Sequence, residues 1–336
     1  MKIRAPGKLI LSGEHAVVYG APALAMAVNR YVEATARSQT LPLISFDLSD
    51  LAYHDGLTLT ALKRLKSRIR QQYQRFVSGE RRIRDVLKKS HELAQFAFTL
   101  FLESLNLRLT EGVKIHLQSD IPVGCGMGSS AATILGVTHA VAHFLKKEFS
   151  SDYFYRLALE AENMQHGHSS GLDLKVCLQG GALFAEQGQF EERPIPTLSF
   201  YLVHTGIPQT TTGECVAHVA HHFAERALID AFSDVTRALD EALKLNHFEN
   251  VAHAIRQNHA LLSRIGVVPE NIQHFIRDVE LLGHAAKICG AGAVSGQNAG
   301  IILVAARDIE TLSELCARYR YAVMPVSGEA RGVHVI

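Results

Sequence analysis

One stretch of this chain constrains its fold and chemistry more than any other: residues 121–132 read Ile-Pro-Val-Gly-Cys-Gly-Met-Gly-Ser-Ser-Ala-Ala. Glycines occupy every second position from Gly124 to Gly128. Glycine adopts positive φ and lets a backbone approach a ligand closely. A glycine loop that opens a helix also directs unpaired N–H groups and the positive end of the helix dipole toward one place. Because 113–117 reads as a strand and 131–145 as a helix, we expect an anion-binding loop between them, suited above all to phosphate.

Two well-known phosphate loops differ from this one. No Lys-Ser or Lys-Thr pair follows the last glycine, as a Walker A loop requires, and the glycine spacing is not that of a dinucleotide fold. Neither Ser129 nor Ser130 stands in a G-x-S-x-G nucleophile elbow. Their hydroxyls therefore suit a magnesium ion or a phosphate better than nucleophilic attack. A glycine-rich turn that only caps a buried helix is the simpler alternative.

The composition argues against several classes of partner. The 336 residues are 47% hydrophobic and 20% charged, which is typical of a globular protein, and the net charge is +1. Such a balance gives no field that would attract nucleic acid or a membrane surface, and the longest clean apolar run, Ile301 to Ala306, is too short to cross a bilayer. Five cysteines without a C-x-x-C pair favour reduced thiols. We expect a cytoplasmic protein with neither nucleic-acid nor membrane partners.

Residues 59–90 are strongly basic, with Glu80 and Asp85 as their acidic residues. A solvated pair of helices is the favoured interpretation. Nucleic-acid binding is less favoured, because no aromatic interleaving or base-reading motif accompanies the charge. A contribution of these side chains to holding the outer phosphates of a nucleotide is a further alternative.

A lysine interrupts an apolar strand near the start of the chain. Residues 2–12 alternate like a strand, and Lys8 lies within it. A lysine in such a place is rarely buried without a partner. Near a phosphate it would neutralise charge that develops during transfer, and near a carboxylate it would lower the pKa of that group. The alternative is a lysine that extends from the strand end into water.

Two carboxylates flank a polar turn in the middle of the chain. Glu162 lies near the end of a predicted helix over 152–165, and Asp173 near the start of another over 171–178. An aspartate at a helix start is most often a cap. Paired with Lys8, it could instead take the proton from a substrate hydroxyl. Glu162 could complete an oxygen shell for magnesium together with phosphate and water.

A third polar group comes after a predicted strand over 200–204. The turn after this strand contains Thr210, Thr211 and Thr212. Each of these hydroxyls can simply cap the next helix.

Together these motifs resemble those of the GHMP family of small-molecule kinases, whose members act on galactose, homoserine, mevalonate or phosphomevalonate. The resemblance covers nearly the entire chain except 39–90. A galactose-specific member would carry Gly-Glu-His-Thr-Asp-Tyr at the first of three motifs that point to the subgroup acting on mevalonate. These motifs are Gly13-Glu14-His15-Ala16-Val17-Val18-Tyr19-Gly20, His166-Gly167-x-x-Ser170-Gly171-x-Asp173 and Pro208-x-x-Thr211.

The resemblance implies an α+β fold of two domains with the active cleft between them, and commonly a homodimer. An N-terminal ATP-binding domain of the ribosomal S5 domain 2-like fold would span 1–193, with the basic helical insertion at about 59–90. A ferredoxin-like C-terminal domain would span 194–336. The implied reaction transfers the γ-phosphoryl group of ATP, with Mg2+, to the primary hydroxyl of mevalonate.

The resemblance also implies a role for each matching residue. Asp173 would be the base for the acceptor alcohol, with Lys8 beside it and the hydroxyl of Thr211 supporting it. Ser130 and Glu162 would hold magnesium. The residues at the acceptor pocket would be Glu14, His15, Gly290 and Gly292. The residues around the triphosphate would be Pro122, Gly124, Gly126, Met127, Gly128, Ser129, Ser130 and Ala131.

Two departures separate this chain from the family pattern. Leu174 comes directly after Asp173 where the family often has asparagine, and the segment 287–300 lacks the usual glycine run of the third motif. The kinase class is therefore better determined than the acceptor. Phosphomevalonate, a sugar or another small alcohol are alternative acceptors, and a related phosphorylating decarboxylase is an alternative enzyme. A non-catalytic ligand sensor on the same fold is a further alternative, against which Lys8, Glu162 and Asp173 together argue.

Overall fold

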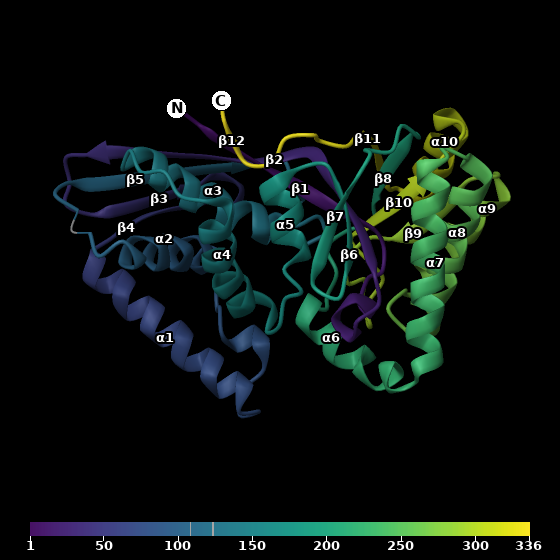
Figure 1. Cartoon of the computed structure of the whole chain (residues 1–336), viewed down its shortest axis with the longest axis horizontal. Coiled ribbons are helices and arrows are strands. Elements are labelled where there is room, and N and C mark those ends of the chain that lie inside the picture. The colour runs from purple at the N-terminus through teal and green to yellow at the C-terminus, as the bar shows by residue number, and fades with distance from the viewer. Residues whose placement is uncertain (108, 123) are drawn as a thin grey trace.

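The computed structural model describes residues 1–107, 109–122 and 124–336 (Figure 1). Val123, inside the predicted phosphate loop, lies outside the described residues. Helices and two β-sheets make up the fold, which confirms the predicted α+β class. The larger sheet and the smaller one occupy opposite sides of the molecule in Figure 1.

The larger sheet has eight strands within the described ranges. They are β1 (Ile3–Ser12), β2 (Ala23–Gln39), β3 (Ile44–Leu48), β4 (Tyr53–Leu57), β5 (Gly112–Ser119), β6 (Ala182–Glu186), β7 (Gln189–Arg193) and β12 (His334–Val335). The order is β12-β1-β2-β5-β3-β4, and β6 with β7 extends the sheet from β2. Only β3 and β5 pair in parallel among these strands.

Helices cover one face of this sheet (Figure 1). They are α1 (Leu59–Val77), α2 (Glu92–Ser104), α3 (Ser129–Phe144), α4 (Ser151–His166) and α5 (Leu172–Gln179). Helix α3 packs on β1 and β2, α2 and α4 pack on α3, and α1 lies outside them. The predicted helix over 131–145 is thus α3, and the predicted strand over 113–117 is β5.

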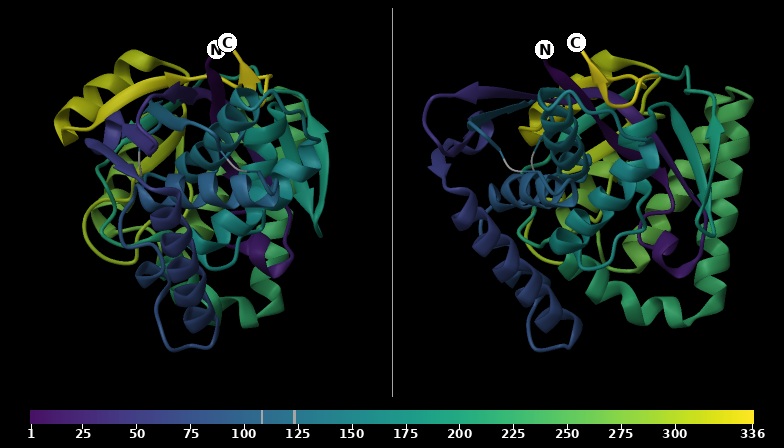
Figure 2. Two further views of the ribbon diagram at one scale, coloured as in Figure 1. Left: turned by 90° about the vertical axis from the view of Figure 1, so that its left-hand side faces the viewer. Right: turned by 60° about the vertical axis from the view of Figure 1, so that its left-hand side comes forward.

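The smaller sheet is antiparallel in the order β11-β8-β10-β9. Its strands are β8 (Phe200–His204), β9 (Ala285–Ile288), β10 (Ile301–Ala305) and β11 (Ala322–Val326). The helices of this part of the chain are α6 (Thr212–Val219), α7 (Arg226–Lys244), α8 (Phe248–Arg264), α9 (Glu270–Leu281) and α10 (Ile309–Tyr319). The last residues leave the smaller sheet and return to β1, so both termini lie side by side (Figure 2).

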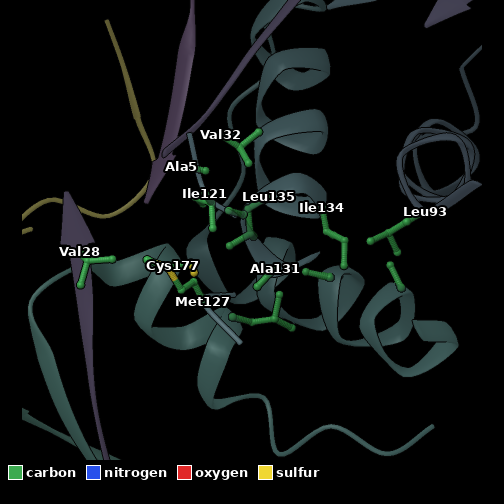
Figure 3. Packing of buried hydrophobic residues seen from close by; sticks show 14 of the residues in the cluster. Ala5, Val28, Val32, Leu93, Ile121, Met127, Ala131, Ile134, Leu135 and Cys177 are labelled. Atoms are coloured by element: carbon green, nitrogen blue, oxygen red, sulfur yellow. The ribbon is translucent and has the colours of Figure 1, made fainter. Parts of the chain in front are cut away.

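The glycine loop is anchored in the main hydrophobic core (Figure 3). Met127 and Ala131 are buried, and their side chains pack near Leu135 and Ile121. Burying a side chain the size of methionine contributes about 1.5–3 kcal/mol. The loop therefore has fixed apolar anchors, and its backbone is held in one place above them.

The basic stretch forms one long helix instead of the expected solvated pair. Helix α1 ends at Val77, and the chain beyond it forms only a short 3-10 helix, Ile83–Asp85, before α2. Arg68 pairs with Glu92 at 2.8 Å, and Arg70 pairs with Glu160. The second expected helix is therefore wrong, and part of the positive charge is neutralised against α2 and α4. No helix in the described residues is long and apolar enough to cross a membrane.

Candidate active site

The glycine loop has the backbone that the spacing predicts. Gly124, Gly126 and Gly128 have φ of 72°, 85° and 73°, in the left-handed region. Gly128 is the N-cap residue of α3, and no side chain caps the helix there. The first N–H groups of α3 and the positive end of its dipole are therefore available to an anion.

Two of these glycines are also required by close packing. A Cβ on Gly126 would overlap the carbonyl oxygen of Cys289, and one on Gly128 would lie 2.8 Å from Cγ of Lys8. The loop is thus wedged between β1 and the segment after β9. A larger residue at Gly126 would push the loop away from Cys289, and one at Gly128 would push it away from Lys8.

Lys8 and Asp173 form the ion pair that the sequence suggested. The Lys8 Nζ lies 3.0 Å from Asp173 Oδ2 and donates to the Gly126 carbonyl at 3.2 Å. Burial disfavours the charged lysine, but the Asp173 carboxylate outweighs it, and the pKa of Lys8 lies above its usual value. Lys8 is 2% exposed and does not reach into water. Asp173 lies in the first turn of α5 with Gly171 as N-cap, so its carboxylate is not the helix cap.

Glu162 is buried close to this pair and interacts electrostatically with both of its members. Its Oε2 accepts a hydrogen bond of 2.6 Å from Ser169 Oγ, while its Oε1 has no hydrogen-bond partner among the described residues. Burial, and next the negative Asp173, raises the pKa of Glu162 to about 8. A buried carboxylate oxygen without a partner is costly unless a cation or a donor arrives.

Ser130 also faces this site, through a contact that sequence reasoning missed. Its Oγ lies 3.1 Å from Nε2 of His166, the last residue of α4. Burial lowers the pKa of His166 to about 4, so its imidazole is neutral at pH 7. Glu162 and His166 stand four residues apart on α4, which places both on one helix face. The spacing of four residues between Glu162 and His166 was the sequence feature that could have indicated that His166 lies at the site.

Glu14 and His15 both contact the chain around the third glycine motif. Glu14 forms an ion pair with Lys287 of β9, in which both side chains are buried. Burial raises the pKa of Glu14, against the opposing effect of Lys287. His15 Nε2 lies 3.0 Å from the Ala291 carbonyl, and burial lowers its pKa to about 4. Sequence reasoning missed Lys287 as the partner, although it opens the third motif.

Gly290 and Gly292 belong to the packing around the loop. Both have positive φ, 84° and 66°. A Cβ on Gly290 would lie 2.7 Å from the Cα of Gly126, so two glycine backbones touch there. A Cβ on Gly292 would overlap the carbonyl oxygen of Val267. The third motif therefore supports the phosphate loop from the side of the smaller sheet.

Thr211 caps a helix, whereas the resemblance implies a role in supporting Asp173. It is exposed and is the N-cap of α6, where its hydroxyl bonds to Glu214. In the hydrogen bonds of the described residues, Thr211 joins neither Lys8 nor Asp173. The simpler interpretation of the hydroxyl-rich turn, a helix cap, is what the structure shows.

Magnesium fits this site only with phosphate oxygens present. Within the described ranges, no three His, Cys, Asp or Glu side chains gather into a metal centre. Ser130 Oγ and the unpartnered Glu162 Oε1 supply one hydroxyl and one carboxylate. Magnesium commonly takes one or two carboxylates and completes its shell with substrate phosphates and water. The donor set is therefore suitable for magnesium bound to a nucleotide.

Comparison with known proteins agrees with this geometry. Residues 92–181, which include the glycine loop, Glu162 and Asp173, match the family described as GHMP kinases N terminal domain. A mevalonate kinase of Pyrococcus furiosus is 30% identical over 308 residues, 86% of this chain and 85% of that protein. One of Thermococcus onnurineus is 31% identical over 302 residues, with 86% and 85% covered.

A solved structure shows the same fold over almost the whole length. The crystal structure of the Methanococcus jannaschii mevalonate kinase superimposes with a TM-score of 0.80 at 25% identity, covering 98% of each chain. Sequence and fold thus match over both sheets, beyond the loop motif. The chain belongs to the mevalonate kinase family of GHMP kinases and is a small-molecule phosphotransferase.

Proposed function

We propose that this kinase transfers the γ-phosphoryl group of ATP to the primary hydroxyl of mevalonate. The observation that carries the proposal is the Lys8–Asp173 pair, 3.0 Å apart, beside the open N-terminus of α3. The relatives at about 30% identity are mevalonate kinases, and this supports the choice of acceptor.

Asp173 acts as the base in this proposal. Its carboxylate takes the hydroxyl proton as the alcohol oxygen attacks the γ-phosphorus in line and the bond to the leaving ADP oxygen breaks. Lys8 orients the Asp173 carboxylate through their ion pair and places positive charge beside the transferring group. The side chain of Asp173 is 27% exposed, against 3% for Lys8, so the base is the member of the pair that a substrate can reach.

In this proposal the glycine loop would hold the triphosphate, and Ser130 with Glu162 would hold magnesium. Backbone N–H groups from Gly124 to Ala131 would bind phosphate oxygens at the start of α3. When bound, magnesium would supply neutralisation of the phosphate charge. The unpartnered oxygen of Glu162 is the structural feature that supports this assignment.

The acceptor would lie near Glu14 and His15, on the side of the 287–292 segment. Gly290 and Gly292 would line this side through their backbones, because neither carries a Cβ. We propose that Thr211 affects the acceptor only through the position of α6, since its hydroxyl is engaged as a cap.

We further propose a domain division at residues 193 and 194, between β7 and β8. The two sheets lie on either side of this point, and the terminal strand β12 crosses back to the larger one. A cytoplasmic location is supported by the buried thiols of Cys177, Cys215, Cys289 and Cys316, which form no disulfides. A homodimer, which the family resemblance implies, is tested by light scattering.

An acceptor panel tests the function. ADP release is followed by a coupled assay with mevalonate, phosphomevalonate, galactose and homoserine at equal concentrations. We expect mevalonate to give the highest kcat/KM, by at least about tenfold. A higher value for another alcohol would replace the acceptor. Tight ATP binding without ADP release for any alcohol would instead identify a ligand sensor.

A further inference from the structure

The end of α1 and the turn after it, residues 73–84, make contacts that the phosphoryl-transfer site does not explain. We call this segment the strap. The Tyr73 hydroxyl donates to the carbonyl oxygen of Gly167 at 2.8 Å. A Cβ on Gly167 would lie 2.8 Å from the ring of Phe76. Gly167 stands between Glu162 and Asp173 in the chain, so the strap holds the segment that carries both carboxylates.

The other end of the strap contacts the start of α6. Arg84 Nη1 lies 3.1 Å from Glu214 Oε1. Glu214 also closes the capping box of α6 with Thr211. Ile83 is buried and occupies the space that a side chain on Gly213 would need. The strap therefore joins the 162–173 segment of the first part of the chain to α6 of the second.

The glycine at position 213 is a second, independent indication that Ile83 packs against α6. It lies in the first turn of α6 and has no positive φ, so its backbone does not require glycine. Glycine in a helix costs up to about 1 kcal/mol relative to alanine. The docking of Ile83 gives the physical reason for glycine at this position, because a Cβ there would displace the strap.

The start of α6 is in turn connected to the third glycine motif. Thr210 Oγ1 accepts a hydrogen bond of 3.3 Å from the Val294 N–H. Among the hydrogen bonds and ion pairs of the described residues, none joins the strap to residues 122–131. Its contacts thus lie on the base and third-motif sides of the site and not on the phosphate loop.

We propose that the strap positions α6 against the Asp173 segment and thereby sets the affinity for the acceptor alcohol. Ile83 and Arg84 are positioning residues in this proposal and do not touch the reacting atoms. The proposal rests on the proposed kinase function, because it assigns the acceptor to the Asp173 side. It also gives the basic stretch a role that needs no nucleic acid.

A steric double-mutant cycle tests the contact between Ile83 and Gly213. Gly213→Ala favours the helix but forces Ile83 away, and overpacking of this kind typically costs about 1–3 kcal/mol. We expect KM for mevalonate to rise about tenfold and KM for ATP to stay within about twofold. The Tm should fall by no more than a few degrees, because the helix propensity of alanine offsets part of the overpacking cost. Ile83→Ala combined with Gly213→Ala should return KM to that of Ile83→Ala alone. An unchanged KM in Gly213→Ala, or no compensation in the double variant, would overturn the proposal.

Charge reversal tests the other contact with a matched control. Arg84→Glu places two acids together and should raise KM for mevalonate about threefold to fivefold, as expected for a partly exposed pair. Arg81→Glu makes the same change of charge on an exposed neighbour with no side-chain ion pair among the described contacts, and KM should not change. Equal effects of both substitutions would show a general charge effect and no positioning role.

Hydrogen exchange separates this proposal from the identity of the acceptor. Amides of residues 78–86 should exchange faster in Gly213→Ala than in the unsubstituted protein, with or without an acceptor. If mevalonate is not the acceptor, the unsubstituted enzyme fails the panel while this exchange difference persists. If exchange is equal in both proteins, Ile83 does not dock on α6 and the strap proposal fails.

Discussion

The Lys8–Asp173 and Lys287–Glu14 pairs both bury a lysine against a carboxylate near the candidate site, and they differ in one respect. In the Lys8–Asp173 pair, the side chain of Asp173 is 27% exposed. In the Lys287–Glu14 pair, the two side chains are 0% and 1% exposed. The first pair leaves one carboxylate open to a substrate, whereas the second is closed on both sides.

The difference separates a chemical role from a structural one. Taking a lysine and a carboxylate out of water is costly, and removal of one partner leaves a buried charge alone. The closed pair joins the end of β1 to β9 and hence the larger sheet to the smaller one. Glu14 therefore contributes first to the assembly of the site, while Asp173 contributes to the reaction.

The strongest test of the comparison is Asp173→Asn. Loss of the base should lower kcat by about 10²–10⁴-fold. The buried Lys8 also loses its counter-charge, so the Tm should fall, but less than in Glu14→Gln because this pair is partly open to water. ADP release gives kcat, and titration with a fluorescent ATP analogue should show nearly unchanged affinity. Asp152→Asn, in the first turn of α4, is the control. A kcat within threefold of normal would remove Asp173 from the role of base.

Glu14→Gln should act on stability in place of chemistry. It leaves Lys287 buried without a counter-charge, which costs about 3–5 kcal/mol of unfolding free energy. Urea denaturation measures the loss, and Glu14→Gln with Lys287→Met should recover much of it. A large rise in KM for the acceptor with unchanged stability would place Glu14 in the pocket and remove the contrast between the pairs.

Glu162→Gln tests whether the carboxyl next to the open Lys8–Asp173 pair binds magnesium. Glutamine keeps an acceptor for Ser169 but cannot ionise to bind a cation, so the magnesium concentration for half-maximal ADP release should rise about 10–100-fold. Magnesium-dependent binding of the fluorescent ATP analogue, measured without acceptor, should weaken in parallel. Unchanged magnesium dependence in both assays would assign the unpartnered oxygen of Glu162 another role.

His15→Asn tests how the stability of the protein depends on pH through a buried histidine next to the closed Lys287–Glu14 pair. The folded protein holds His15 at a pKa of about 4, below the usual value, so the unfolded chain binds more protons between about pH 4 and 6.5. Stability from this group is present above pH 6.5 and is lost as pH falls, by about 2 kcal/mol between pH 7 and 5. Asparagine tolerates the φ of 61° at this position. Urea midpoints of the variant should therefore depend less on pH in this range, and an equal slope would contradict the assignment.

Local patterns predicted the parts of the site that are close in sequence. The alternation of glycines and the helix after them gave β5, the loop and α3, because glycine conformation and helix periodicity are local properties. The strand pattern by itself indicated only that a buried Lys8 needs an anionic partner, and the choice of Asp173 came from the family resemblance. For the hydroxyl-rich turn, a helix cap was only the alternative to the supporting role that the resemblance implied for Thr211, and the structure shows the cap.

Contacts between distant segments were the ones that the patterns missed. Lys287 was read as part of a glycine motif and not as the partner of Glu14. The stretch 59–90 was read as a pair of solvated helices, but Ile83 is buried against α6. Both errors have one cause, since each residue has a partner more than a hundred positions away.

The amino-acid sequence by itself determined the phosphate loop, the two carboxylates and the need for charged partners, because these properties depend on backbone freedom and the cost of burying charge. Only the tertiary structure decided which lysine meets which carboxylate and which of the two pairs stays open. Exposure belongs to the packed molecule, in which Glu14 is enclosed against β9 while Asp173 stays partly exposed. No single segment encodes that choice, since it arises where the two sheets meet.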